Sequence, residues 1–249
     1  MAQRRIEYQG ECFELSYERR KPLHIDIIES SSIPMILFLH GWGSNKDVMK
    51  IAFNQCFAEY EHIYLDMPGF GNSPNEKPLH TQDYAGIVCQ FLIDINAPTT
   101  EDSIVVGHSF GGKVGVLCKP KELILLSSAG IRVPKSLKVR FKIMTAKIMG
   151  KLGLSKFNKI FRSSDVKTMN EGMYQTFKNV VDEDFSLEFS AYKGKTSIFW
   201  GKDDNVTPLF CGKKIAELMA KSRFFVLEGD HYFFLKQGAK VEQLYKEQV

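Results

Sequence analysis

Residues 103–113 read Ser-Ile-Val-Val-Gly-His-Ser-Phe-Gly-Gly-Lys, and this stretch decides the fold. Its first half is a short, mostly apolar run of the kind that forms a buried strand, and its second half can begin a helix. Glycines on both sides of Ser109 permit a sharp turn between the two, in which the serine backbone is strained and its Oγ projects into solvent. The stretch therefore predicts an exposed, reactive serine at the end of a buried strand.

A serine hydroxyl is a poor nucleophile at neutral pH, so it needs a general base and a carboxylate that orients the base. Candidates of both kinds follow strand-like runs further along the chain. The run 196–200 leads into Gly-Lys-Asp-Asp, which places Asp203 and Asp204 just after a strand. The run 224–227 leads into Glu-Gly-Asp-His, which ends at His231. The sequence thus offers a serine, an acid and a histidine in that order.

Two more motifs lie upstream of the serine. Residues 36–43 read Ile-Leu-Phe-Leu-His-Gly-Trp-Gly, and residues 66–73 read Asp-Met-Pro-Gly-Phe-Gly-Asn-Ser. Together with Gly-His-Ser-Phe-Gly and the order serine, acid, histidine, they resemble the α/β-hydrolase superfamily over nearly the whole chain. The resemblance implies a serine carboxylesterase-like enzyme with a helical cap. The chain is also similar to meta-cleavage-product (2-hydroxy-6-oxo-dienoate) hydrolases.

The resemblance implies catalytic roles for three residues. Ser109 corresponds to the nucleophile and His231 to the general base. The family's acid lies three residues after the glycine that closes its strand and four before a proline, which selects Asp204 over Asp203. The family's other acid position, after the sixth strand, falls at residues 127–130, which read Ser-Ser-Ala-Gly and offer no carboxylate.

The oxyanion hole needs two N–H groups aimed at the carbonyl oxygen, each contributing about 3 kcal/mol by analogy with measured cases. The resemblance assigns them to the backbone of Trp42 and Phe110. It implies no cofactor and no metal.

Other titratable residues receive structural interpretations. Asp230 precedes His231 but would have to fold back along one short loop, so it is interpreted as a solvated turn residue. His40 and His108 are expected to shape their loops. The remaining histidines have no partners at ligand spacing and are expected to be structural or exposed: His24, His62 and His80.

The order of strand and helix signals predicts an α/β fold with a doubly wound, mostly parallel sheet. Residues near 6–19 and 23–29 predict an antiparallel start. Further strands are expected near 35–40, 62–66, 103–108, 122–127, 196–200 and 223–227, and helices at 46–59, 81–95, 209–221 and 232–247. The stretch 113–121 is shorter than the helix that usually follows the serine in this family.

Residues 1–130 and 195–249 are expected to form the hydrolase core, and residues 131–194 an inserted helical cap, because the strand pattern stops there. From Arg132 to Arg162 the expected cap carries ten Lys or Arg and no Asp or Glu. Such a run is interpreted either as a solvated helix face, or as a surface for an anionic substrate, an anionic carrier or an anionic membrane. No recognition motif for nucleic acid accompanies the charge.

Composition favours a cytoplasmic enzyme. The 249 residues suffice for one large domain, and no run approaches the roughly 20 apolar residues of a membrane span. The first residues lack the apolar region of a secretory signal. The five cysteines are odd in number and scattered, which is typical of reduced thiols.

The sequence supports several hypotheses about activity. The first is hydrolysis of carboxylic esters, small or with a short acyl group, through an acyl-enzyme. The alternatives are C–C bond hydrolysis of 2-hydroxy-6-oxo-dienoates, release of a methyl ester from an acyl-carrier protein, and an inactive hydrolase fold used for binding. C–C hydrolases of this type have Gly-Pro-Gly in the oxyanion loop and Asn before the nucleophile. The chain has Gly41-Trp42-Gly43 and His108 there, which favours ester cleavage.

Overall fold

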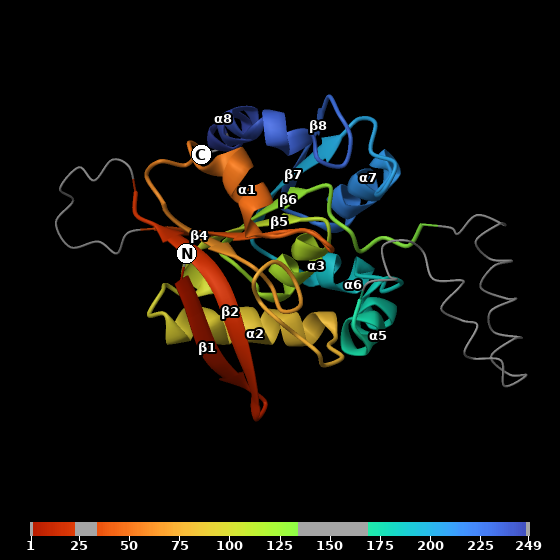
Figure 1. Ribbon diagram of the computed structural model, residues 1–249. Helices are drawn as coiled ribbons and strands as arrows, with labels where there is room; N and C mark the ends of the chain where they lie inside the picture. Colours follow the sequence, from red (N-terminus) through yellow and green to blue (C-terminus); the bar gives the residue numbers. More distant parts are fainter. Residues whose placement is uncertain (1, 23–33, 134–168, 248–249) are drawn as a thin grey trace, which may run out of the picture.

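The computed structural model describes residues 2–22, 34–133 and 169–247, which form one eight-stranded sheet with helices on both faces (Figure 1). The strand order is β1-β2-β4-β3-β5-β6-β7-β8. The strands are β1 Ala2–Tyr8, β2 Glu11–Arg20, β3 Met35–Leu39, β4 Glu61–Leu65, β5 Ile104–His108, β6 Glu122–Leu126, β7 Lys195–Gly201 and β8 Ser222–Leu227. From β4 to β8 neighbouring strands run parallel, and β1 and β2 are antiparallel. The predicted doubly wound, mostly parallel sheet is confirmed.

The helices form two layers around the sheet. They are α1 Lys46–Phe53, α2 Thr81–Asp94, α3 Phe110–Leu117, α5 Glu171–Val180, α6 Ser186–Ala191, α7 Leu209–Leu218 and α8 Gly238–Lys246. Alternate residues of each central strand serve the two layers: Leu37 and Leu39 pack in a cluster with α2, α3 and α7, whereas Ile36 and Phe38 pack with α1 and α8. Both faces of β3 are therefore buried, as parallel sheets require.

The N-terminal hairpin gives the sheet the antiparallel start that was expected. Its turn lies at Gln9 and Gly10, inside the segment 6–19, and both residues have positive φ, 52° and 76°. Two consecutive positive φ values make a tight hairpin turn whose twist suits antiparallel strands. The sequence did not indicate this turn, because its first residue is glutamine, whereas asparagine or aspartate is the usual residue before the glycine. The strand expected at 23–29 lies outside the described residues.

The last expected helix, 232–247, is divided in two. A short 3₁₀ helix, Phe233–Lys236, precedes α8. At the junction a Cβ on Gly238 would lie 2.0 Å from the carbonyl oxygen of Ala52 in α1, so only glycine allows this approach. Phe233 and Phe234 are buried, whereas Tyr232 and Leu235 stay more than a third exposed, so only half of this aromatic stretch faces the core.

The short stretch after Ser109 still forms a helix, α3, which ends at Leu117. Its glycines let it lie directly on the sheet: a Cβ on Gly111 would be 2.4 Å from the carbonyl oxygen of Leu39. Lys119 then leaves the helix with a φ of 48°. Close packing on the sheet thus allows a short helix to connect β5 with β6.

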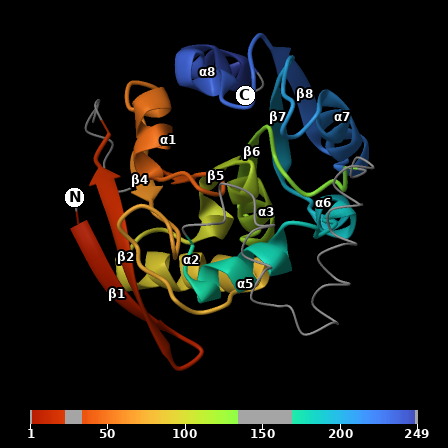
Figure 2. The same ribbon diagram turned by 45° about the vertical axis from the view of Figure 1, so that its right-hand side comes forward.

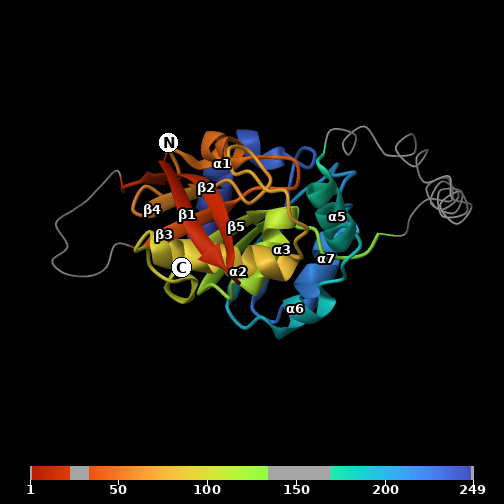
Figure 3. The same cartoon turned by 60° about the horizontal axis from the view of Figure 1, so that its bottom comes forward.

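Two helices of the expected cap segment, α5 and α6, lie beside α3 and away from the β1–β2 hairpin in every view (Figures 2 and 3). Residues 134–168 lie outside the described residues, and with them all of the basic run except Arg132. In the described part of the chain, none of the helices has the length and apolar character needed to cross a membrane.

Candidate active site

Ser109 occupies the turn between β5 and α3. Its φ of 50° and ψ of −112° are unusual for a residue with a side chain, and such strain is typical of functional turns. Its N–H donates to the carbonyl of Leu126 at 3.1 Å, and its own carbonyl accepts from Gly112 and Ala129 at 3.0 Å each. A Cβ on Gly107 would lie 2.5 Å from the carbonyl oxygen of Gly111, so this turn requires glycine.

Ser109 lines a pocket of about 760 Å³. One part of the wall is apolar, formed by aromatic and aliphatic side chains of several elements: Trp42, Phe110, Ile131, Val133, Phe177, Val180, Val181 and Val206. The charged residues of the lining are Lys113, Arg132, Asp182 and Glu183. The pocket has room for a small ligand beside the serine hydroxyl.

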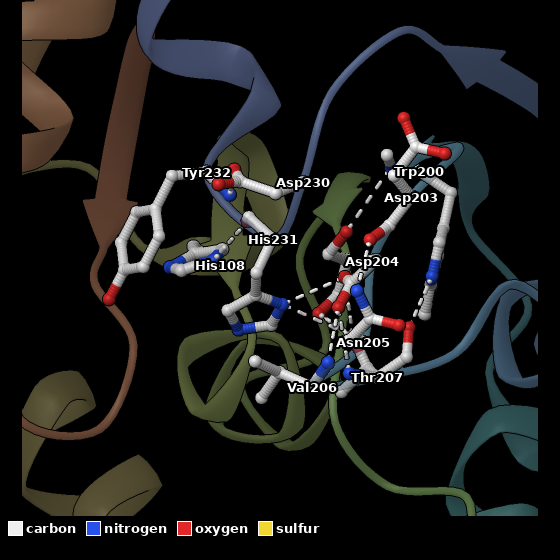
Figure 4. Close-up of polar contacts among 12 residues, drawn as sticks. His108, Trp200, Asp203, Asp204, Asn205, Val206, Thr207, Asp230, His231 and Tyr232 are labelled. Carbon is white, nitrogen blue, oxygen red and sulfur yellow. Dashed lines mark hydrogen bonds and ion pairs between the residues drawn. The ribbon is translucent and has the colours of Figure 1, made fainter.

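The two other predicted catalytic residues contact each other. Nδ1 of His231, after β8, lies 2.8 Å from Oδ2 of Asp204, after β7 (Figure 4). Burial alone would raise the pKa of Asp204. The hydrogen bond from His231, the charge of His231 and further hydrogen-bond donors outweigh burial, so the pKa of Asp204 is lowered to about 2. Asp204 is therefore ionised at neutral pH, and an ionised acid favours the tautomer of His231 with its proton on Nδ1.

In the described structure, the carboxylates of the neighbouring aspartates are not hydrogen-bonded to the His231 ring. Asp203 is exposed, and its backbone N–H donates to the carbonyl of Gly229 at 2.9 Å. Asp230 is exposed and accepts a hydrogen bond from the Tyr232 N–H at 2.8 Å, as a turn residue does.

Ser109 and His231 lie in the same region but are not hydrogen-bonded to each other within the described residues. The ring of His108, which precedes Ser109, lies 4.6 Å from the ring of His231, and Thr207 beside His231 lines the same pocket as Ser109. Serine–histidine hydrogen bonds are often long in enzymes without substrate and shorten when it binds. The arrangement can support nucleophilic attack by a serine with a histidine as base.

The predicted oxyanion-hole residues flank Ser109. Phe110 is the first residue of α3, so its N–H has no acceptor within the helix and lies at the positive end of the helix dipole. Trp42 follows β3, and its ring packs edge-on against Phe110 at 5.5 Å. Both residues line the pocket with Ser109.

His40 supports the loop that carries Trp42. It is fully buried; its Nδ1 donates to the carbonyl of Gly41 at 2.8 Å and its Nε2 accepts from the N–H of Met67 at 3.1 Å. Burial lowers the pKa of His40 to about 4, so the ring stays neutral, as these two hydrogen bonds require.

The other described histidines have structural surroundings. His62 is fully buried between Tyr64 and the carbonyl of Phe57, and His80 caps α2 and is exposed. His24 lies outside the described residues.

Sequence reasoning missed Lys113, four residues after Ser109. Its side chain is 3% exposed, and its Nζ contacts the carbonyl of Val180 at 2.7 Å and Oε2 of Glu183 at 2.6 Å. Burial lowers the pKa of Lys113, which Glu183 partly opposes. The pair ties α3 to the end of α5, and a lysine within the apolar, glycine-rich helix was the available signal.

Comparisons with known proteins place these observations in a family. A family model described as "Alpha/beta hydrolase family" matches residues 36–244. The curated 2-succinyl-6-hydroxy-2,4-cyclohexadiene-1-carboxylate synthase of Klebsiella pneumoniae (strain 342) is 30% identical over 93 residues, which cover 36% of this chain and 35% of that protein. The chain therefore matches only about a third of the length of this relative.

Solved structures share the fold at low identity. A thermophilic esterase from Thermogutta terrifontis, with malate bound, has a TM-score of 0.71 and 17% identity, covering 100% of this chain and 98% of that one. A meta-cleavage product hydrolase from Pseudomonas fluorescens IP01 has a TM-score of 0.65 and 18% identity, covering 98% and 96%. At these identities the likeness concerns the fold alone.

Proposed function

Because the chain belongs to the alpha/beta hydrolase family, we propose that it is a serine hydrolase that cleaves carboxylic esters through an acyl-enzyme. The observation that carries this proposal is the strained turn at Ser109 on the wall of the pocket, with the His231–Asp204 pair beside it. A buried carboxylate, a histidine and a half-buried serine on the wall of a pocket are the parts that ester hydrolysis requires.

In the proposed mechanism Ser109 Oγ attacks the ester carbonyl while Nε2 of His231 takes its proton. The backbone N–H groups of Trp42 and Phe110 donate to the oxyanion. As the tetrahedral intermediate collapses, His231 returns the proton to the leaving alcohol. Water then attacks the acyl-enzyme with His231 as base, which releases the acid and restores the serine. Asp204 accepts the Nδ1 proton of His231 in a hydrogen bond throughout and stabilises the imidazolium.

We propose a small or short-acyl ester as substrate, since the pocket volume of about 760 Å³ also has to hold the alcohol part. Residues 131–194 are proposed to form the cap, because Phe177, Val180 and Val181 of this segment line the pocket together with residues of the core. A cytoplasmic location is part of the same proposal.

The experiment is a hydrolysis assay with p-nitrophenyl esters of increasing acyl length. Hydrolysis should be fastest for the short esters, and Ser109→Ala should lower it at least about a thousandfold. Ser222→Ala, a serine at the far end of β8, serves as the matched control and should keep full activity. Hydrolysis that survives Ser109→Ala would contradict the assignment of the nucleophile.

A second candidate comes from the curated relatives: formation of 2-succinyl-6-hydroxy-2,4-cyclohexadiene-1-carboxylate, the reaction in their name. This reaction should be assayed in parallel with the p-nitrophenyl esters. Hydrolysis of a 2-hydroxy-6-oxo-dienoate and of a methyl ester on an acyl-carrier protein should be measured in the same series. A kcat/KM for one of these far above that for every simple ester would replace hydrolysis of small esters as the function while keeping Ser109 as the reactive group.

A further inference from the structure

The Asp204 carboxylate receives more hydrogen bonds than the one from His231. Its Oδ1 accepts from the backbone N–H groups of Val206 at 2.8 Å and Thr207 at 2.9 Å. Its Oδ2 accepts from Thr207 Oγ1 at 2.9 Å and from His231 Nδ1 at 2.8 Å. Each oxygen therefore has two donors, which is the usual capacity of a carboxylate oxygen.

The Thr207 hydroxyl shares Oδ2 with His231. It has one proton and three neighbours: Oδ2 of Asp204, the carbonyl oxygen of Ser127 at 3.1 Å and Nδ1 of His231 at 3.3 Å. Because Nδ1 donates its own proton to Asp204, the hydroxyl's nearest charged acceptor is the same carboxylate. Figure 4 shows the rings and side chains of His231, Asp204 and Thr207 converging at this point.

Ser127 lies beside Thr207, after a neighbouring strand. It follows β6, is fully buried and has a φ of 44°, in the left-handed region that residues with a side chain rarely adopt. Its N–H donates to the carbonyl of Phe199 at 2.9 Å, and its Oγ accepts from the N–H of Gly201 at 3.4 Å. The Ser127 hydroxyl is also one of the groups that lower the pKa of Asp204. Strained backbone of this kind persists where the surroundings hold it, and it is frequent at functional sites.

We propose that Ser127 and Thr207 are positioning residues, a hydroxyl pair that fixes the Asp204 carboxylate against Nδ1 of His231 and so sets the orientation of the base. The inference rests on the proposed function, in which His231 is that base. A buried carboxylate with free lone pairs can rotate about its last bond, whereas one with all its acceptor positions occupied cannot do so without breaking hydrogen bonds. The Thr207 hydroxyl takes one acceptor position of Oδ2 and leaves the other to the imidazole.

The first test compares Thr207→Val, which keeps the shape of the side chain and removes the hydroxyl, with Thr207→Ser, which keeps the hydroxyl. For p-nitrophenyl acetate, Thr207→Val should lower kcat by about tenfold to a hundredfold with little change in KM, and Thr207→Ser should restore most of it. The downfield proton NMR signal of the His231 Nδ1–H in the free enzyme should shift or broaden in the valine variant only. Thr196→Val, the same substitution at a buried threonine near the start of β7, is the matched control and should leave the signal in place.

The second test separates the Ser127 hydroxyl from its backbone. Ser127→Ala and Ser127→Gly both remove the hydroxyl, but glycine also tolerates the φ of 44° without strain. Equal losses of kcat and equal shifts of the Nδ1–H signal in both variants would support the hydroxyl. A loss in the alanine variant alone would overturn its role and leave only backbone strain.

The outcomes distinguish this inference from the proposed function. If Ser109→Ala abolishes hydrolysis while Thr207→Val and Ser127→Ala keep both kcat and the Nδ1–H signal, the positioning role is wrong and the ester hydrolase proposal stands. If Ser109→Ala keeps hydrolysis, the proposed function is wrong, and the NMR signal still reports whether the hydroxyls hold Asp204. If one variant does not fold, as judged by circular dichroism, the other provides the same two measurements.

Discussion

The ring of His108 lies against the ring of His231, with centroids 4.6 Å apart, and Nε2 of His108 lies 3.1 Å from the backbone carbonyl of His231. The residue before the proposed nucleophile therefore supports the loop of the proposed base. Burial, and then the neighbouring His231, lower the pKa of His108 well below its ordinary value, so its ring is neutral and donates through Nε2.

His108→Ala should lower both stability and kcat. The ring is fully buried and also packs on Phe234 at 4.8 Å, so its removal leaves a cavity and an unpaired carbonyl. We expect the free energy of unfolding, measured in urea, to fall by about 2–4 kcal/mol. His108→Asn keeps a side-chain donor and should retain more activity than alanine, and equal kcat values in the two variants would exclude a role for the hydrogen bond.

Asp204→Asn should lower kcat by about 10⁴-fold, because an amide at this position favours the wrong tautomer of the histidine. The measurement is steady-state hydrolysis of p-nitrophenyl acetate. Asp203→Asn is the matched control one residue away, exposed and without contact to the imidazole, and should have a mild effect. The opposite ranking would move the acid to Asp203.

The Lys46–Asp66 ion pair should contribute strongly to stability. Its atoms are 2.7 Å apart and its side chains are 1% and 0% exposed, so Asp66→Asn leaves a buried ammonium without its counter-charge. Breaking such a pair costs about 3–5 kcal/mol in unfolding free energy, which thermal and urea unfolding can measure. Glu228→Gln breaks the exposed Lys202–Glu228 pair and should change little. Similar effects of both substitutions would contradict the role of burial.

Stability should fall as the solution is acidified below neutrality. Burial lowers the pKa values of His40 and His62 to about 4, whereas both titrate near 6.5 in the unfolded chain. Between these values the unfolded chain binds protons that the folded chain does not, so acid favours unfolding by roughly 3 kcal/mol per histidine across the window. Urea unfolding at several pH values measures the slope. His62→Gln should reduce it, and an unchanged slope would show that His62 does not titrate in this way.

The basic run between Arg132 and Arg162 predicts a dependence on salt for an anionic ester. If these charges attract the substrate, kcat/KM should fall steeply as salt rises past about 0.1 M, where the Debye length is about 10 Å. Replacing Lys138, Arg140 and Lys142 by Gln should mimic high salt. A neutral ester of the same acyl length is the control. An equal response of both esters to salt would indicate that the basic run is only a solvated face.

The sequence by itself determined the backbone framework of this protein. A sharp turn at Ser109 requires glycine at 107 and 111, and that requirement is local, so the motif could be recognised without the rest of the chain. Most strands of the sheet were predicted for the same reason, since each carries its own run of apolar residues. The hairpin turn at Gln9 and Gly10 was not predicted, because glutamine is unusual at the first position of such a turn.

Only the tertiary structure decided which side chains surround the predicted site. Thr207 and Ser127 are 80 residues apart and meet because β6 and β7 are neighbours in the sheet. Lys113 and Glu183, 70 residues apart, meet because α5 lies beside α3. Such contacts depend on strand order and helix placement, and no short pattern encodes these. A buried hydroxyl beside a carboxylate therefore has the same sequence appearance as any other serine or threonine, although its position in the fold gives it a partner.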